Sequence, residues 1–202
     1  MSSRIPLKAG DSKLPRGRSL LLVLAWLCSC LFAASHAAAQ PPKPTEYQIK
    51  AAFLYNFAKF VDWPEDSFHS ETAPFVFGIL GDDPFGDDVD ALTMKTINSR
   101  AVKIRRMGDV REARACHVLF ISSSEEEHIE QILRVMQTSR TLLVSDISNF
   151  AAQGGMINFI VKDNNVRFVI NRAAMVKAGI NLHSRLLKMA VMVYDSQDHT
   201  AN

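Results

Sequence analysis

Cysteine is scarce in this sequence, with three residues among 202, and two of them, Cys28 and Cys30, lie near the start of the chain. Beyond residue 39 only Cys116 remains, so that part of the chain has no second thiol for an internal disulfide, a redox pair or a metal pair. Cys116 heads an apolar run, which indicates a buried small hydrophobic residue rather than a reactive thiol. Glycine and proline are also few, and the 48% hydrophobic and 22% charged residues exclude disordered, fibrous and multi-span membrane proteins.

The chain also lacks a strong excess of charge of one sign. The formal net charge is +2, but five of the 23 Lys and Arg and one of the 21 Asp and Glu precede residue 40. The remaining chain carries 18 basic and 20 acidic side chains, a net charge of about −2. This leaves no polycationic footprint for nucleic-acid phosphates or for an anionic membrane surface, so we expect neither partner.

The first apolar run is too short to span a bilayer. It covers residues 20–34, about 15 residues where a spanning helix needs roughly 20. It follows a basic stretch and precedes Ala37 to Ala39, which is the order of a secretory signal peptide with a small-residue cleavage site. We therefore expect residues 1–39 to be a signal peptide cleaved near Ala39 and the mature chain to be exported, with an uncleaved anchor as the disfavoured alternative.

The mature chain opens with a helix signal. Thr45 and Gln48 form a T-x-x-Q capping box, in which each side chain hydrogen-bonds the backbone N–H of the other residue. Apolar residues then recur at helical spacing from Ile49 to Phe60. The proline after Trp63 ends the pattern, so we expect an amphipathic helix that stops at or before Trp63.

Strand patterns follow, separated by helix signals. Ser122 to Ser124, for example, precede three glutamates and an amphipathic stretch, which favours a helix start. Strands of this kind separated by helices indicate a parallel sheet that is covered on both faces. The predicted strands are residues 75–80, 102–104, 117–121 and 141–145.

The pattern changes toward the C-terminus. Apolar runs at residues 156–161 and 166–170 flank the Asn-rich stretch 162–165, which is typical of a tight antiparallel hairpin. The fold class we expect is therefore α/β: a single three-layer domain at residues 45–195, with a mixed, mostly parallel sheet and a C-terminal antiparallel hairpin.

Two final helices are expected after the hairpin. Asn171 has the side chain to cap a helix that ends near Gly179. Ser184 in turn precedes apolar residues at helical spacing through Tyr194, which predicts a last helix.

Residue patterns that would carry catalysis, a cofactor or a metal are missing. The loop at residues 81–86 has no dinucleotide or P-loop motif, and Asp82 and Asp83 would repel a phosphate. The acidic residues at 82–90 do not match a calcium loop, the histidines lack metal-ligand spacing, and Ser122 to Ser124 lack a nucleophile elbow. We therefore expect no catalytic residues, no cofactor, no metal and no enzyme activity.

The mature chain nevertheless resembles a known family, the YfiR-like periplasmic proteins. The resemblance spans nearly all of the mature chain and is specific as a combination of short motifs. These motifs are residues 50–64 (KAAFLYNFAKFVDWP), 78–86 (GILGDDPFG), 116–122 (CHVLFIS), 144–146 (VSD) with Phe150, 154–159 (GGMINF), 166–171 (VRFVIN) and 184–190 (SRLLKMA).

This resemblance implies a periplasmic regulator rather than an enzyme. The namesake of the family represses a membrane-bound diguanylate cyclase by binding its periplasmic sensory domain, which lowers cyclic-di-GMP and biofilm formation. The resemblance also implies that the protein forms a homodimer. The namesake's disulfides cannot form here, because only Cys116 lies in the mature chain. The alternative that the residues leave open is a periplasmic small-molecule binding or carrier protein.

The second hairpin strand is the expected partner surface. Phe168 and its alternate neighbours are expected to be buried, whereas Arg167 and Val169 are expected to face outward, close to the turn at Asp163. The resemblance points to the same stretch. Asp163, Arg167 and Val169 are therefore the predicted partner-binding residues, with helices on both faces of the strand as the competing arrangement.

Overall fold

The structure is a computed structural model that describes residues 42–195. The predicted signal peptide at residues 1–39 lies outside this range. Within it, no helix is both long and apolar enough to cross a membrane.

The first helix, α2, begins as its capping box predicts. It spans Glu46–Lys59, with the Thr45 hydroxyl accepting the Gln48 N–H at 3.1 Å and the Gln48 side chain accepting the Thr45 N–H at 3.0 Å. Past its C-terminus, the Trp63 indole N–H donates to the Ala58 carbonyl at 2.8 Å, which folds the proline-containing exit back onto the helix. The predicted helix is therefore confirmed at both ends.

Strands and short helices alternate along the rest of the chain. The strands are β1 Val61–Asp62, β2 Phe75–Leu80, β3 Thr96–Ile97, β4 Arg100–Met107, β5 Val118–Ile121, β6 Leu142–Ser145, β7 Ile157–Lys162, β8 Asn165–Asn171, β9 Asn181–Leu182 and β10 Met192–Tyr194. The remaining α-helices are α3 Asp87–Asp90, α4 Ile129–Met136, α5 Arg172–Lys177 and α6 Ser184–Leu187. The 3₁₀ helices are η1 Glu65–Ser67, η2 Ala91–Met94, η3 Val110–Ala115 and η4 Ser123–His128.

Eight strands form one mixed sheet in the order β10-β8-β7-β6-β5-β2-β4-β3, and β1 and β9 form a separate antiparallel pair. The five strands β4, β2, β5, β6 and β7 run parallel to one another, whereas β8 pairs with β7 in the predicted antiparallel hairpin. The expected α/β fold with a mixed, mostly parallel sheet is confirmed.

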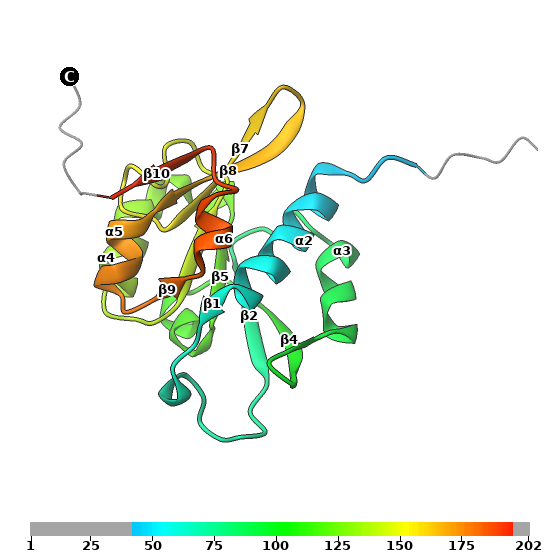
Figure 1. Cartoon of the computed structure of the whole chain (residues 1–202), viewed down its shortest axis with the longest axis vertical. Helices are drawn as coiled ribbons and strands as arrows, with labels where there is room; N and C mark the ends of the chain where they lie inside the picture. The colour runs from blue at the N-terminus through cyan, green and yellow to red at the C-terminus, as the bar shows by residue number, and fades with distance from the viewer. Residues whose placement is uncertain (1–41, 196–202) are drawn as a thin grey trace, which may run out of the picture. The chain divides into compact units, whose positions relative to one another are not determined.

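Helices cover the two faces of this sheet (Figure 1). On one face, Phe53 and Phe57 of α2 contact Phe159 of β7 and Phe168 of β8, with ring centroids 5.0 to 6.1 Å apart. On the other face, α4 and α5 lie beside Leu143 of β6. Adjacent residues of the central strands are consequently buried on both sides, which explains their unbroken apolar runs.

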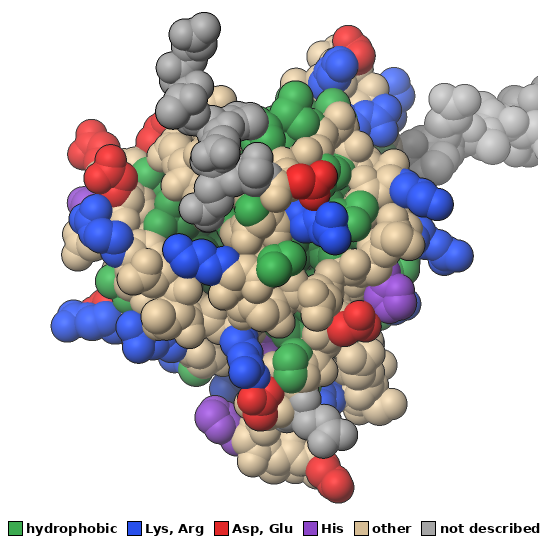
Figure 2. Space-filling view, turned by 60° about the vertical axis from the view of Figure 1, so that its left-hand side comes forward, with side chains coloured by type: hydrophobic (Ala, Val, Ile, Leu, Met, Phe, Trp, Pro, Cys, Tyr) green, Lys and Arg blue, Asp and Glu red, His purple; other side chains and the backbone are tan. Residues whose placement is uncertain are grey.

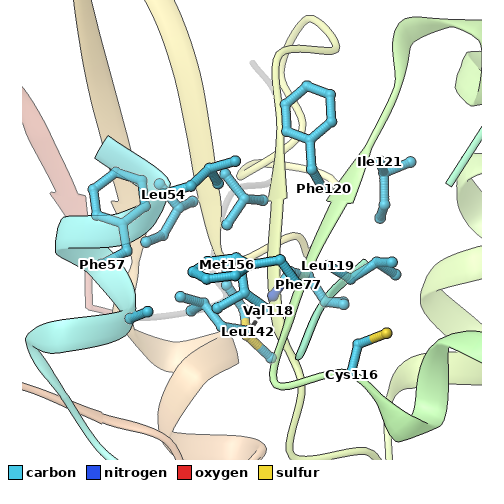
Figure 3. Packing of buried hydrophobic residues seen from close by; sticks show 14 of the residues in the cluster. Leu54, Phe57, Phe77, Cys116, Val118, Leu119, Phe120, Ile121, Leu142 and Met156 are labelled. Atoms are coloured by element: carbon cyan, nitrogen blue, oxygen red, sulfur yellow. Dashed lines mark hydrogen bonds between the residues drawn. The ribbon is translucent and has the colours of Figure 1, made fainter. Parts of the chain in front are cut away.

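The core is one continuous cluster of buried apolar side chains. Figure 3 shows Leu54 and Phe57 of α2 approaching the sheet from one side, while Leu119 and Cys116 point to the other side. Cys116 is buried and unpaired, as its sequence context predicts. Burial raises the pKa of its thiol to about 11, so it is neutral at physiological pH.

The C-terminal segment corrects one prediction. The expected last helix stops after one turn, α6, and the chain then continues as the strand β10. The Val191 N–H donates to the Phe168 carbonyl at 2.9 Å, and β10 pairs in parallel with the outer edge of β8. Hydrogen bonding to an open sheet edge therefore outweighs the helical spacing of a short apolar segment.

Candidate functional site

The carboxyl ends of β5 and β6 lie at the edge of the sheet where open α/β folds usually bind their ligands. A cavity of about 510 Å³ opens there, which we call the carboxyl-edge cavity. Its walls come from the start of α2, the turn after β5, the loop after β6 and the projecting part of β7. The lining residues are Glu46, Tyr47, Lys50, Ser123, Asp146, Ser148, Asn149, Asn158, Phe159, Ile160 and Val161.

A buried lysine is the centre of this cavity's polar wall. Lys50 is only 3% exposed, and its ammonium lies 2.6 Å from a carboxylate oxygen of Asp146 and 2.6 Å from one of Glu46. The Tyr47 hydroxyl donates to the same Asp146 oxygen at 3.0 Å, and the Tyr47 ring lies 4.3 Å from the ammonium. These four side chains, which we call the Lys50 cluster, join the first turns of α2 to the loop after β6.

The electrostatics of this cluster keep the lysine charged. Burial alone would lower the pKa of Lys50, but hydrogen bonds to Asp146 and Glu46 and the charge of Asp146 outweigh it, so the pKa is raised. Burial and the Asp146 carboxylate likewise raise the pKa of the Tyr47 hydroxyl. The charged lysine and the protonated tyrosine both donate to Asp146, and neither serves as a base near neutral pH.

The loop after β6 is fixed by hydrogen bonds around Ser145. Its hydroxyl donates to the Ile121 carbonyl at 2.7 Å and accepts the Ile147 N–H at 3.0 Å. The Asn158 amide donates to the Ile147 carbonyl at 2.9 Å. Asp146 is thereby held toward Lys50, and its second carboxylate oxygen, Oδ1, is buried without a hydrogen-bond partner in the described part of the chain.

The β7–β8 hairpin forms the wall opposite α2 and projects beyond the body of the molecule (Figure 1). Its loop is two residues long, Asp163 and Asn164, both with positive φ, at +51° and +56°. Arg167 of β8 is exposed and is paired with Ile160, which lines the cavity. Val161, which follows Ile160 on β7, is 57% exposed. The sequence places it in the buried apolar run of the first hairpin strand, so its exposure was not predicted.

The predicted site residues divide between surface and interior. Asp163 and Arg167 are exposed on the projecting hairpin, as expected. Val169 is 9% exposed, so the expectation that it faces outward is wrong. Its position on β8 pairs with Met192 of β10 on one side and with Asn158 of β7 on the other, so it lies inside the sheet instead of at the edge.

The Lys50 cluster was not predicted as a site from the sequence. The available signal is that Lys50 lies three and seven residues before Phe53 and Phe57, on the apolar stripe of α2, where a charged residue needs a partner. Its partner Asp146 lies 96 positions away, and only the fold brings the two together.

The loop after β2, where a phosphate-binding loop would lie, uses its polar groups internally. The Asp82 N–H donates to the Ser124 hydroxyl at 2.9 Å, and Asp83 accepts from Arg106 at 2.7 Å. Asp90 of the acidic stretch also pairs with Arg106, at 3.0 Å. Within residues 42–195, no three His, Cys, Asp or Glu side chains are placed to hold a metal ion.

A second exposed surface lies at the C-terminal edge of the sheet. Figure 2 shows apolar side chains among Lys and Arg on the side of the molecule that carries α5 and β10. Four of the large apolar side chains that are exposed in the described range belong to this region: Val176, Met189, Val191 and Met192.

Comparison with known proteins connects this architecture to a family. No protein of curated function matches the chain. A family model described as YfiR/HmsC-like matches residues 47–191, a range that runs from Tyr47 of the Lys50 cluster through the hairpin to the edge of β10. The chain therefore belongs to the YfiR/HmsC-like family.

Proposed function

We propose that this protein is a periplasmic, non-enzymatic regulator that binds the periplasmic domain of an inner-membrane signalling protein. The partner we propose is a diguanylate cyclase, whose repression lowers cyclic-di-GMP and biofilm formation. Membership of the YfiR/HmsC-like family supports a regulatory role in cyclic-di-GMP signalling. The sequence resemblance also implies a homodimer.

The observation that carries the proposal is the projecting hairpin. A two-residue turn closes it, and Phe159 and Phe168 anchor its base against α2. The hairpin is thus ordered before a partner arrives, which reduces the entropy lost on binding. It offers an apolar anchor, Val161, on one face and a cationic group, Arg167, on the other. Protein interfaces use apolar anchors at their centre and charged groups at their rim.

The carboxyl-edge cavity beside the hairpin suits the same role. Val161 and Ile160 form one of its walls and the Lys50 cluster forms another. A partner segment that follows the hairpin would place an apolar side chain against Val161, which is exposed and lines the cavity.

The proposal is tested by deleting the gene and measuring cellular cyclic-di-GMP. Deletion is expected to raise cyclic-di-GMP, and a plasmid copy of the wild-type gene is expected to lower it again. A copy that carries Val161→Asp and Arg167→Glu is expected to leave cyclic-di-GMP high, because both side chains are exposed and the changes remove the apolar and the cationic contact.

A matched control carries the same two kinds of change elsewhere. Val176→Asp with Lys177→Glu alters an exposed apolar and an exposed basic residue on α5, and this variant is expected to restore repression. Both variants are expected to melt within a few degrees of the wild type. Unchanged cyclic-di-GMP on deletion, or full repression by the hairpin variant, would contradict the proposal.

A further inference from the structure

A second cavity lies at the opposite edge of the sheet, where β2, β5 and β6 begin. We call it the amino-edge cavity. Its volume is about 430 Å³, enough for a small organic molecule. Residues 66–74 cover it from one side, and η3 with the start of β5 forms its floor. The lining residues are Asp66, Ser67, Phe68, His69, Ala73, Pro74, Val76, Lys103, Arg105, Arg114, Ala115, Cys116, His117, Arg140 and Thr141.

The charge of this lining differs from that of the rest of the chain. Four side chains with permanent positive charge face one carboxylate, that of Asp66, whereas the chain beyond residue 39 is slightly acidic overall. Arg140 pairs with Asp66, and Arg105 pairs with Glu112 at 3.3 Å. Two cations are left without a carboxylate among the described residues, Lys103 and Arg114.

The sheet geometry places these cations on one side. Lys103 and Arg105 are two residues apart on β4 and therefore point to the same face. Arg114 comes from η3 and donates to the Val135 carbonyl at 3.1 Å, which holds its guanidinium in place without neutralising it. Gly78 on the adjacent β2 leaves room for the Cys116 sulfur, because a Cβ at Gly78 would lie 2.7 Å from that atom.

The remaining wall is flat and apolar. The His117 ring packs against both Phe68 and Phe75, with centroids 4.5 and 4.6 Å away. Its Nδ1 accepts the Val76 N–H at 3.0 Å, so Nε2 carries the proton and donates to the Ser67 carbonyl at 3.1 Å. Both ring nitrogens are therefore occupied, and His117 has no hydrogen bond to offer a ligand.

We propose that the amino-edge cavity binds a small organic anion with at least two negative charges, a phosphate ester or a polycarboxylate. Lys103 and Arg114 would supply the charged hydrogen bonds, and Phe68 with Val76 would contact the carbon part of the ligand. Two uncompensated cations favour a dianion, since a monoanion would leave one of them unpaired. This inference is independent of the proposed partner, because the cavity lies at the other end of the strands from the hairpin.

The test is isothermal titration calorimetry on the purified protein with phenyl phosphate and citrate, and with benzyl alcohol as an uncharged comparison. Both anions are probes of the site, and at least one is expected to bind saturably below about 1 mM while benzyl alcohol does not. Lys103→Gln is expected to weaken the binding about tenfold or more, because it removes a charged hydrogen bond. Lys103→Arg is expected to retain most of the affinity.

The variants separate a site from general charge attraction. Lys103 is exposed and makes no hydrogen bond or ion pair within residues 42–195, so Lys103→Gln is expected to fold normally. Lys177→Gln, an exposed lysine on α5, removes the same charge far from the cavity and is expected to bind as the wild type does. Equal weakening in Lys103→Gln and Lys177→Gln, or no binding of either anion up to about 10 mM, would overturn the inference.

Discussion

A single residue, Lys50, connects the first helix to the loop that follows β6. Its ammonium is buried between two carboxylates, so removing it would leave the Asp146 carboxylate largely buried, with only the Tyr47 hydroxyl as a donor. Leaving one member of a buried ion pair without its partner is far costlier than losing a surface ion pair.

We predict that Lys50→Met lowers the free energy of unfolding by about 3–5 kcal/mol in urea denaturation. Lys162→Met, at an exposed lysine of the hairpin, is expected to change it by less than about 0.5 kcal/mol. The double change Lys50→Met with Asp146→Leu is expected to recover part of the loss, because no charge is then left without its partner. A Lys50→Met protein as stable as the wild type would contradict this account.

His117 makes stability depend on pH. Burial against Phe68 and Phe75 lowers its pKa in the folded protein below the ordinary value of 6.5, with nearby Arg100 adding to the effect. Below pH 6.5 the unfolded chain therefore binds a proton that the folded chain resists, so the stabilisation is complete above that pH and is lost as the pH falls.

We predict that the wild type loses stability between pH 7 and pH 5 more steeply than His117→Gln, whose amide does not titrate in this range. The difference in slope is expected to reach at most about 1.4 kcal/mol per pH unit, the value for one proton. Urea denaturation at a series of pH values measures this difference in slope. Parallel slopes would show that His117 titrates alike in the folded and unfolded chain.

At the scale of elements, the hairpin turn shows how backbone conformation selects residues. Asp163 and Asn164 both have positive φ, which a two-residue hairpin loop of type I′ requires and which Asn, Asp and Gly tolerate best. We predict that Asn164→Val lowers the free energy of unfolding by about 1–2 kcal/mol, because a β-branched residue is strained in this conformation. Asn164→Gly is expected to equal or exceed the wild type. Thermal unfolding of the two variants tests this prediction. Equal melting temperatures for Asn164→Val and Asn164→Gly would contradict the turn assignment.

Elements whose signals are local were predictable from the sequence. The capping box of α2, the strand β2 and the Asn-rich hairpin each depend on neighbouring residues, and each is found where predicted. The segment at 192–194 was predicted to continue the last helix. Its three residues are too few to distinguish the helical period of 3.6 residues from the strand period of two. Its partner β8 lies more than 20 residues earlier, and the open edge there decides the outcome.

The candidate site was less predictable than the fold. The hairpin location and the exposure of Arg167 could be predicted from the turn residues and the strand alternation. The burial of Val169 could not, because it depends on the pairing of β10 with the edge of β8. The Lys50 cluster and the amino-edge cavity each combine residues from separate parts of the chain, and no local pattern connects them.

At the scale of the whole molecule, one apolar core extends through both faces of the sheet from α2 to α6. A core of this kind has no internal boundary at which part of the chain could unfold alone. We predict a single calorimetric transition for residues 40–202, with equal calorimetric and van't Hoff enthalpies. A second transition, or a van't Hoff enthalpy well below the calorimetric one, would indicate two independently unfolding parts.

The buried thiol of Cys116 can be used to measure local opening of the structure around β5. Because it is buried and its pKa is raised to about 11, the native protein holds almost no thiolate at pH 8 for a labelling reagent to attack. In a chain with Cys28→Ser and Cys30→Ser, the rate of modification by a thiol reagent would then follow the fraction of molecules that open around β5. We expect that rate to fall when an anion occupies the amino-edge cavity, which Cys116 lines, so labelling of the purified protein would report occupancy of this cavity.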